Sequence, residues 1–236
     1  AEHFFDGYKA NKDYALKALN AAADAGADWL VLCDTNGGTL PHEIFEIVSE
    51  VRTSLPQAKL GVHCHNDTEN AVANSLAAVR AGVRQVQGTL NGVGERCGNA
   101  NLISIIPSLM LKMGFETGVK PENLSKLTKL SRFLDERLNR PANAHAAYVG
   151  EAAFAHKGGL HVSAMARDSR TYEHISPDVV GNERVILVSD KAGRSNVVSR
   201  LTQMGLNDEA EHKDLPKLIA EIKNREMQGY AYDAAD

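Results

Sequence analysis

WLVLCDTNGGTLPHEIFEIVSEVRTSLPQAKLGVHCHND, residues 29–67, contains one complete strand–helix–strand pattern. Residues 29–33 form a continuous apolar run, which is typical of a strand buried on both faces. Pro41 then opens a helix whose apolar residues recur at helical spacing, since proline is favoured in the first turn. Residues 60–65 form the next strand. This order predicts parallel strands joined by helices, which is an α/β fold.

The same rhythm extends in both directions from this stretch. Further strands are expected at residues 2–5 and 84–90, and further helices at residues 11–26, 71–79 and 99–113. These elements form about four βα units. Such units fit half of an eightfold barrel or a small open sheet, and the strands alone do not decide between the two.

A second, mainly helical region follows. Helices are expected at residues 121–138, 195–204 and 215–227, with an irregular connection at 141–149 and a loop with a short helix at 151–166. We therefore predict two domains, a barrel half at residues 1–118 and a small helical linker subdomain at residues 119–236.

Composition excludes several classes of protein. The 236 residues carry a net charge of -4 and contain no dense Lys/Arg block, so nucleic acid is not an expected partner. No apolar stretch is long enough to span a membrane. The three cysteines are odd in number and never spaced as CxxC, which favours reduced thiols and a cytoplasmic location. The chain opens without Met and closes as a new strand pattern begins, so both ends are expected to be cut.

Two histidines stand two residues apart at the end of the strand at residues 60–65. The strand period points His63 and His65 to the same side, as in a metal-binding pair. A hydrogen-bonded pair without metal is the alternative reading. Asn66 and Asp67 follow, either to orient the rings or to cap the next helix, and capping is the preferred role for Asp67.

A glycine-rich loop, NGVGERCGN at residues 91–99, follows the strand at residues 84–90. Its glycines allow backbone to approach a ligand closely. Glu95, Arg96 and Asn99 supply a base or acceptor, a cation and an amide oxygen. Glycine-rich loops alone are weak evidence, but this one lies one βα unit after the histidine pair, on the same predicted face.

Four motifs together carry a family resemblance: CDTNGG, HCHND, NGVGERCGN and GGLHVSA. In this order the chain resembles the acyl-CoA condensing enzymes, a family that includes citramalate, isopropylmalate and homocitrate synthases. AEHFFDGYKAN at the start and RTYEHISPDVVGN near residue 175 are most similar to the citramalate synthase branch. The resemblance implies the C-terminal part of a (β/α)8 TIM barrel, followed by the linker subdomain.

The resemblance also implies a metal site and substrate-binding residues. His63, His65 and Asn99 correspond to the ligands of a divalent metal, which the ligand types leave open among Zn, Mn, Co and Mg. The family's fourth ligand, an Asp on the first barrel strand, has no counterpart, so this chain alone is expected to be inactive. Thr35, Glu95 and Arg96 are assigned to substrate binding, Thr35 to the ketoacid carboxylate, although Thr35 alone also fits a strand-end turn.

Catalytic roles are implied for three residues. His161, assisted by Glu2, corresponds to the base, and Tyr172 completes the site. In the family the linker subdomain reaches over a partner subunit's barrel, which implies a homodimer. His156 and His174 do not match the motif and are interpreted as structural.

The implied reaction is a Claisen-type condensation of acetyl-CoA with a 2-oxoacid. Pyruvate is the expected 2-oxoacid, giving citramalate in branched-chain amino-acid (isoleucine/leucine) biosynthesis. The alternatives are a 2-isopropylmalate or homocitrate synthase, a lyase of the same superfamily, a metal hydrolase, and a catalytically silent fragment. GGLHVSA favours a synthase over a lyase.

Overall fold

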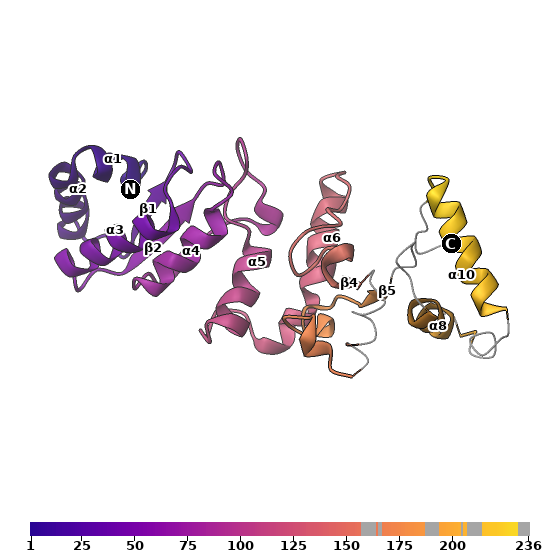
Figure 1. Ribbon diagram of the computed structural model, residues 1–236. Helices are drawn as coiled ribbons and strands as arrows, with labels where there is room; N and C mark the ends of the chain where they lie inside the picture. Colours follow the sequence, from indigo (N-terminus) through magenta and orange to yellow (C-terminus); the bar gives the residue numbers. More distant parts are fainter. Residues whose placement is uncertain (157–163, 165–166, 187–193, 204, 207–213, 231–236) are drawn as a thin grey trace. The chain divides into compact units, whose positions relative to one another are not determined.

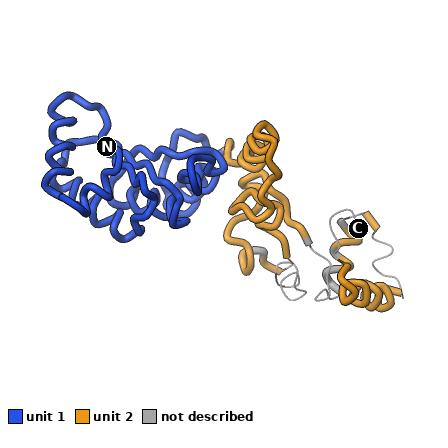
Figure 2. Tube along the Cα trace, turned by 90° about the horizontal axis from the view of Figure 1, so that it is seen from above, with its two compact units in different colours: residues 1–121 blue, residues 122–236 orange. Residues whose placement is uncertain are grey.

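The computed structural model describes residues 1–156, 164, 167–186, 194–203, 205–206 and 214–230. Two compact units make up the chain, Ala1–Pro121 and Glu122–Asp236 (Figure 2). The sequence-based division into domains at residues 1–118 and 119–236 remains a prediction, and each unit is described by itself.

The first unit is built on a parallel sheet of three strands in the order β1-β2-β3. The strands are β1 (Leu30–Asp34), β2 (Leu60–Cys64) and β3 (Gln85–Gln87). They are joined by α3 (Pro41–Ser54) and α4 (Ala71–Arg80), which pack against each other in front of the sheet (Figure 1). The predicted α/β class is therefore confirmed, although β3 is shorter than the strand expected at residues 84–90.

The prediction of a strand at residues 2–5 is wrong. The chain instead forms α1 (Phe4–Ala10) and then α2 (Lys12–Asp24), which is capped by the Asn11 side chain. Phe4, Phe5 and Tyr8 are all buried, a spacing that matches one face of a helix. Ala1 alone pairs with β1, through its amino group to the Val31 carbonyl at 2.6 Å and through its carbonyl from the Cys33 amide at 3.1 Å. Residues 1–121 thus hold three βα units, not four.

The apolar core lies between the sheet and the helices. Leu32 and Val62 are fully buried on the helix side of β1 and β2. Ile44 and Val48 of α3 belong to the same core cluster and are equally buried. Burying one such side chain stabilises the fold by about 1.5 to 3 kcal/mol. Cys33 and His63, at alternate positions of β1 and β2, are only partly buried and face away from this core.

The helix expected at residues 99–113 is divided. α5 (Leu102–Pro107) is followed by a π-helical turn, η2 (Ser108–Lys112). Pro107 lacks a backbone N–H, so the regular helical ladder is interrupted there. A short 3₁₀ turn, η1 (Leu90–Gly92), precedes α5 in the glycine-rich loop.

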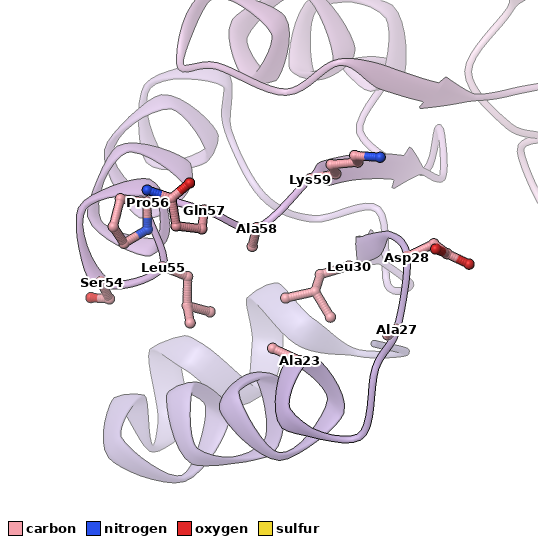
Figure 3. A pocket seen from close by; sticks show the side chains of 10 residues that line it. All are labelled: Ala23, Ala27, Asp28, Leu30, Ser54, Leu55, Pro56, Gln57, Ala58 and Lys59. Atoms are coloured by element: carbon pink, nitrogen blue, oxygen red, sulfur yellow. The ribbon is translucent and has the colours of Figure 1, made fainter.

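A cavity of about 510 Å³ opens at the N-terminal ends of β1 and β2 (Figure 3). Leu30, Leu55 and Pro56 form apolar walls, and Lys59 lies at its rim. His63 and His65 stand at the other end of β2, so this cavity is separate from the predicted site.

The second unit is mainly helical, as predicted. The α-helices in its described residues are α6 (Leu127–Arg137), α8 (Arg194–Gln203) and α10 (Leu215–Met227). Short 3₁₀ turns are η3 (Pro121–Lys126), η4 (Glu151–Phe154), η5 (Ser169–Thr171) and η6 (Pro177–Val180). A two-stranded parallel pair of β4 (Ala155–His156) and β5 (Val185–Ile186) was not predicted. In the described parts of the chain, no helix has the length and apolar character that a membrane crossing requires.

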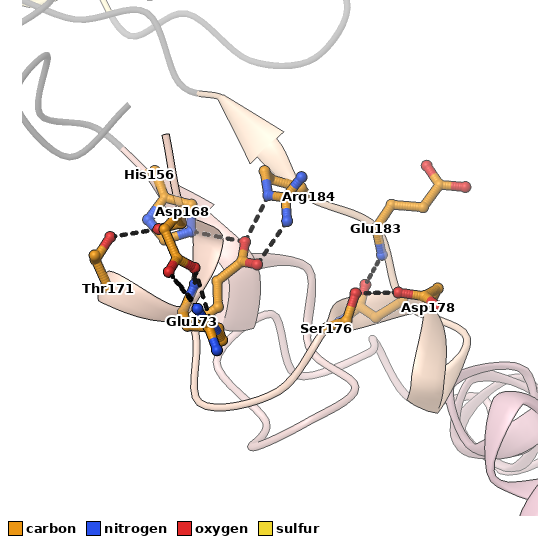
Figure 4. Close-up of polar contacts among 10 residues, drawn as sticks. His156, Asp168, Thr171, Glu173, Ser176, Asp178, Glu183 and Arg184 are labelled. Atoms are coloured by element: carbon orange, nitrogen blue, oxygen red, sulfur yellow. Dashed lines mark hydrogen bonds and ion pairs between the residues drawn. The ribbon is translucent and has the colours of Figure 1, made fainter. Parts of the chain in front are cut away.

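A buried carboxylate connects separate segments of this unit. Glu173 accepts two hydrogen bonds from Arg184, both of 2.6 Å, and its Oε1 lies 3.3 Å from His156 Nε2 (Figure 4). The Glu173 side chain is only 2% exposed. Arg184, and secondarily His156, hold the pKa of Glu173 below its usual value against the opposing effect of burial. His174, the next residue, packs against Tyr148 and Phe154.

We expect Glu173→Gln to lower the free energy of unfolding by about 1.5 to 3 kcal/mol, because hydrogen bonds to charged groups are lost. The folded-state pKa of Glu173 is lowered. Its stabilisation is therefore complete above the unfolded value of about 4.3 and disappears as pH falls through the folded value. Chemical denaturation of both proteins at pH 7 and below pH 4 measures this. Glu151→Gln, at an exposed position of the same unit, is the control. Equal stability of Glu173→Gln and wild type at pH 7 would contradict the assignment.

Candidate active site

The two histidines lie side by side at the end of β2. His63 pairs in register with Cys33 of β1 and Gln87 of β3. His65 follows just beyond the strand, and its amide donates to the Asp34 carbonyl at 3.2 Å. The two imidazole centroids are 5.2 Å apart with the rings inclined at 75°. The structure therefore brings the two rings together, as the strand period predicts.

Asn99 reaches the histidines because the glycine-rich loop folds back along residues 64–66. His65 and Asn99 form a β-bridge, flanked by hydrogen bonds of 2.9 Å from Asn66 N to Gly98 O and from Ala100 N to Cys64 O. Gly98 has a φ of 93°, and a Cβ there would lie 2.1 Å from the Gly92 carbonyl. Only glycine fits this close approach.

Among the described residues, five buried side-chain atoms lack a hydrogen-bond partner, and three of them lie at this site, whereas Asp6 Oδ2 and Asn74 Oδ1 do not belong to it. The Nδ1 atoms of His63 and His65 and the Oδ1 atom of Asn99 are buried, with no hydrogen-bond partner among the described residues. Buried polar atoms of this kind nearly always have a partner. Burial, and then the neighbouring His65, lower the pKa of His63, which favours the neutral imidazole, the form that binds metals.

The donor set of these residues fits a divalent metal. Two imidazole nitrogens and an amide oxygen suit Zn, Mn, Co or Mg. Within the described part of the chain, no group of three His, Cys, Asp or Glu side chains could hold a metal by itself. A metal at this site would therefore depend on Asn99 as well as on the histidine pair.

Asp67 does not cap α4, contrary to the sequence-based expectation. Its carboxylate instead binds the Arg96 guanidinium through two hydrogen bonds, Nε to Oδ1 at 2.7 Å and Nη2 to Oδ2 at 2.8 Å. Arg96 holds the pKa of Asp67 below its usual value. Asn66 Oδ1 instead accepts a hydrogen bond of 3.1 Å from the backbone N–H of Ala71, at the start of α4. Asp67 therefore pairs with a cation that lies 29 residues away along the chain.

The predicted substrate-binding residues surround the same end of the sheet. Thr35 follows β1, and its Oγ1 accepts a hydrogen bond from His3 N at 2.7 Å. The Thr35 carbonyl accepts a second bond from Arg96 Nη2, also of 2.7 Å. Glu95 is on the glycine-rich loop with its side chain 84% exposed. Their contacts with substrate remain predictions.

The roles and mutual placement of the predicted catalytic residues remain predictions. Glu2 is exposed in the turn before α1. Tyr172 is 44% exposed in the second unit. His161 lies outside the described residues.

One buried polar group near the site was missed by sequence reasoning. Asp34, the last residue of β1, is fully buried, and burial raises its pKa. Thr39 Oγ1 donates to Asp34 Oδ1 at 2.7 Å, and Asn74 Nδ2 donates to the Thr39 carbonyl at 2.7 Å. The backbone carbonyl of Asp34 also accepts a hydrogen bond from the amide of His65. Asp34 therefore links this buried network to the histidine pair. The signal was an acidic residue that directly follows an apolar strand.

The sequence profile of the HMGL-like family matches residues 4–133, and the chain belongs to this family. The profile named homocitrate synthase post-HMGL domain-like matches residues 148–229. Family membership and the parallel strand–helix order together confirm the predicted partial (β/α)8 barrel.

Within the family, the chain is similar to proteins named (R)-citramalate synthase. It is 58% identical to the one from Aquifex aeolicus, 55% to the one from Geobacter sulfurreducens and 53% to the one from Synechocystis. Each comparison covers 100% of this chain and 44% of the relative. The chain thus spans less than half the length of these curated relatives.

We expect His63→Ala to remove most of the bound Co²⁺ from the complete protein, expressed from its whole reading frame, because one nitrogen donor is lost. Metal analysis after equilibrium dialysis measures the loss. His42→Ala, which removes an exposed histidine from α3, is expected to keep the wild-type content. Full Co²⁺ content in the His63→Ala protein would contradict the ligand assignment.

Proposed function

We propose that the protein containing this chain condenses acetyl-CoA with pyruvate to form (R)-citramalate. The observation that carries the proposal is the 58% identity, over the whole chain, to a protein named (R)-citramalate synthase. The three unsatisfied donors of His63, His65 and Asn99 support it, because they suit a metal that binds a 2-oxoacid. Branched-chain amino-acid biosynthesis is the pathway that we infer for this reaction.

The residues of the chain are assigned roles in a Claisen-type condensation. His63, His65 and Asn99 would hold a divalent metal, which would supply Lewis-acid stabilisation of the developing alkoxide. Thr35 is proposed to orient the carboxylate of pyruvate through its hydroxyl, with Glu95 and Arg96 as further substrate-binding residues. Their position around the ends of β1 and β3 supports this assignment.

Proton transfer is assigned to His161, Glu2 and Tyr172. His161, assisted by Glu2, is proposed to take a proton from the methyl group of acetyl-CoA, since a histidine titrates near neutral pH. The resulting carbanion forms the new bond with the ketone carbon of pyruvate, whose oxygen then gains a proton. Hydrolysis of the thioester releases CoA and makes the reaction irreversible. Tyr172 is proposed to complete the site from the second unit.

Other 2-oxoacids are the second candidate. The chain is also 36% identical, over 98% of its length, to a protein named 2-isopropylmalate synthase from Sulfolobus acidocaldarius. The higher identity to the citramalate synthases favours pyruvate.

We expect the complete protein to release CoA from acetyl-CoA only when pyruvate is present, and residues 1–236 alone to release little or none. The shorter protein spans only 44% of its relatives and supplies three of the proposed metal donors. A thiol-reactive dye measures the released CoA, and chiral chromatography identifies the product. Tyr172→Phe in the complete protein is expected to lower kcat. Rapid turnover by residues 1–236 alone, or preference for a bulkier 2-oxoacid, would contradict the proposal.

We further infer that the protein is a homodimer in the cytoplasm, with no nucleic-acid or membrane partner. The inference is supported by the family resemblance, in which the linker subdomain reaches over the barrel of a partner subunit.

Sedimentation velocity at micromolar concentration is expected to show a dimer of the complete protein. A cyclic pair with twofold symmetry is the commonest such assembly. A single monomeric species across the concentration range would contradict the inference.

A further inference from the structure

We propose that Asp67 and Arg96 are positioning residues for the metal site. Their two parallel hydrogen bonds hold the glycine-rich loop, and with it Asn99, against the strand that carries His63 and His65. The inference rests on the metal site of the proposed function and deepens it, because it assigns Arg96 to the assembly of the site.

The first support is that Arg96 joins the loops that follow all three strands of the sheet. Its Nη2 is shared between Asp67 Oδ2 after β2 at 2.8 Å and the Thr35 carbonyl after β1 at 2.7 Å. Arg96 itself belongs to the loop after β3. A rigid bidentate fork of this kind fixes direction as well as distance. Asn99, three residues further along, is placed by the same loop.

The loop conformation at Arg96 also supports this role. Arg96 has a φ of 50°, in the left-handed region that residues with a side chain rarely adopt. Such a backbone persists where surrounding contacts hold it, and often at functional sites. The carboxylate of Asp67 provides the contact that retains the side chain in this position.

Asp67 is in turn held from the loop after β1. A Cβ at Gly37 would lie 2.4 Å from Asp67 Oδ2 and 2.8 Å from the Asp67 amide, so glycine is needed for this packing. The carbonyl of Gly37 accepts bonds from the amide and hydroxyl of Thr68, of 3.2 and 2.7 Å. The backbone that carries Asp67 is therefore held against the loop after β1, independently of Arg96.

Geometry is the main contribution of the pair. The side chains of Arg96 and Asp67 are 43% and 24% exposed, and exposed ion pairs add little to folding stability. The guanidinium already binds Asp67 and the Thr35 carbonyl, and its Nη1 lies 3.8 Å from Glu95 Oε2. Loss of the pair should loosen Asn99 and leave the fold intact.

The test is a double-mutant cycle on the complete protein, with Asp67→Asn, Arg96→Lys and the double variant. Calorimetric titration with Co²⁺ is expected to show each single variant binding about tenfold more weakly or worse, the range found when partners outside the ligand shell are removed. The double variant is expected to be no weaker than the singles, because both remove the same contact. The visible Co²⁺ spectrum should change as the Asn99 oxygen is lost, and the melting temperature should stay close to wild type.

A second measurement does not depend on metal. Hydrogen exchange in the metal-free protein is expected to be faster at the amides of residues 98–100 in Asp67→Asn. The control is Asp168→Asn, which breaks a bidentate pair with Arg170 elsewhere, with contacts of 3.0 and 2.7 Å. It is expected to leave both Co²⁺ affinity and the exchange of residues 98–100 unchanged.

The results separate the two proposals. Wild-type Co²⁺ affinity and unchanged exchange in Asp67→Asn would overturn the positioning role, whatever the activity. Unchanged Co²⁺ affinity in Arg96→Lys would overturn it as well, and a raised KM for pyruvate in that variant would then leave Arg96 with the substrate-binding role alone. Weaker Co²⁺ binding and faster exchange in a protein that never condenses acetyl-CoA with pyruvate would support the positioning role and reject the proposed reaction.

Discussion

The parallel register of three short strands is the constraint on which the first unit depends. Cys33, His63 and Gln87 are paired across β1, β2 and β3, so the three strands end at nearly the same level. In such sheets the loops at the carboxyl ends share one edge, where barrel enzymes place their chemistry. Thr35, His65 and the glycine-rich loop meet at this edge for that reason, although they are far apart in the chain.

The two sides of the sheet perform different physical tasks. Leu32 and Val62 belong to the apolar core that also contains buried residues of α3 and α4, and this core stabilises the unit. The opposite side carries His63, whose Nδ1 has no hydrogen-bond partner among the residues that the structure describes, so an unfavourable polar burial is retained there. The apolar packing on one side of the sheet offsets the free-energy cost of the buried polar atoms on the other. Binding of a ligand at the site would recover the lost interactions.

Local patterns were sufficient to predict much of the fold. The strands at β1 and β2, and the helices that begin at Pro41, Ala71 and Leu215, were anticipated from apolar spacing and from proline. Residues 2–5 were misread because two adjacent phenylalanines fit a strand as well as a helix, and only their packing decides. β4 and β5 are two residues each and have no periodic signal. The histidine pair was predictable from the strand period, whereas the contact between Asp67 and Arg96 was not, because it spans 29 residues.

Cys64 shows a consequence of the strand period for the choice of metal. It stands between His63 and His65 in the sequence, yet its side chain is fully buried. Burial, and secondarily Asp34, raise its pKa, so the sulfur stays protonated. A thiolate beside the imidazoles would attract soft ions such as Cu(I), which prefer sulfur. The alternation of side chains along one strand therefore separates the soft sulfur donor from the harder nitrogen and oxygen donors. Borderline and hard cations are offered the nitrogen and oxygen atoms of His63, His65 and Asn99, and the sulfur of Cys64 stays outside that site.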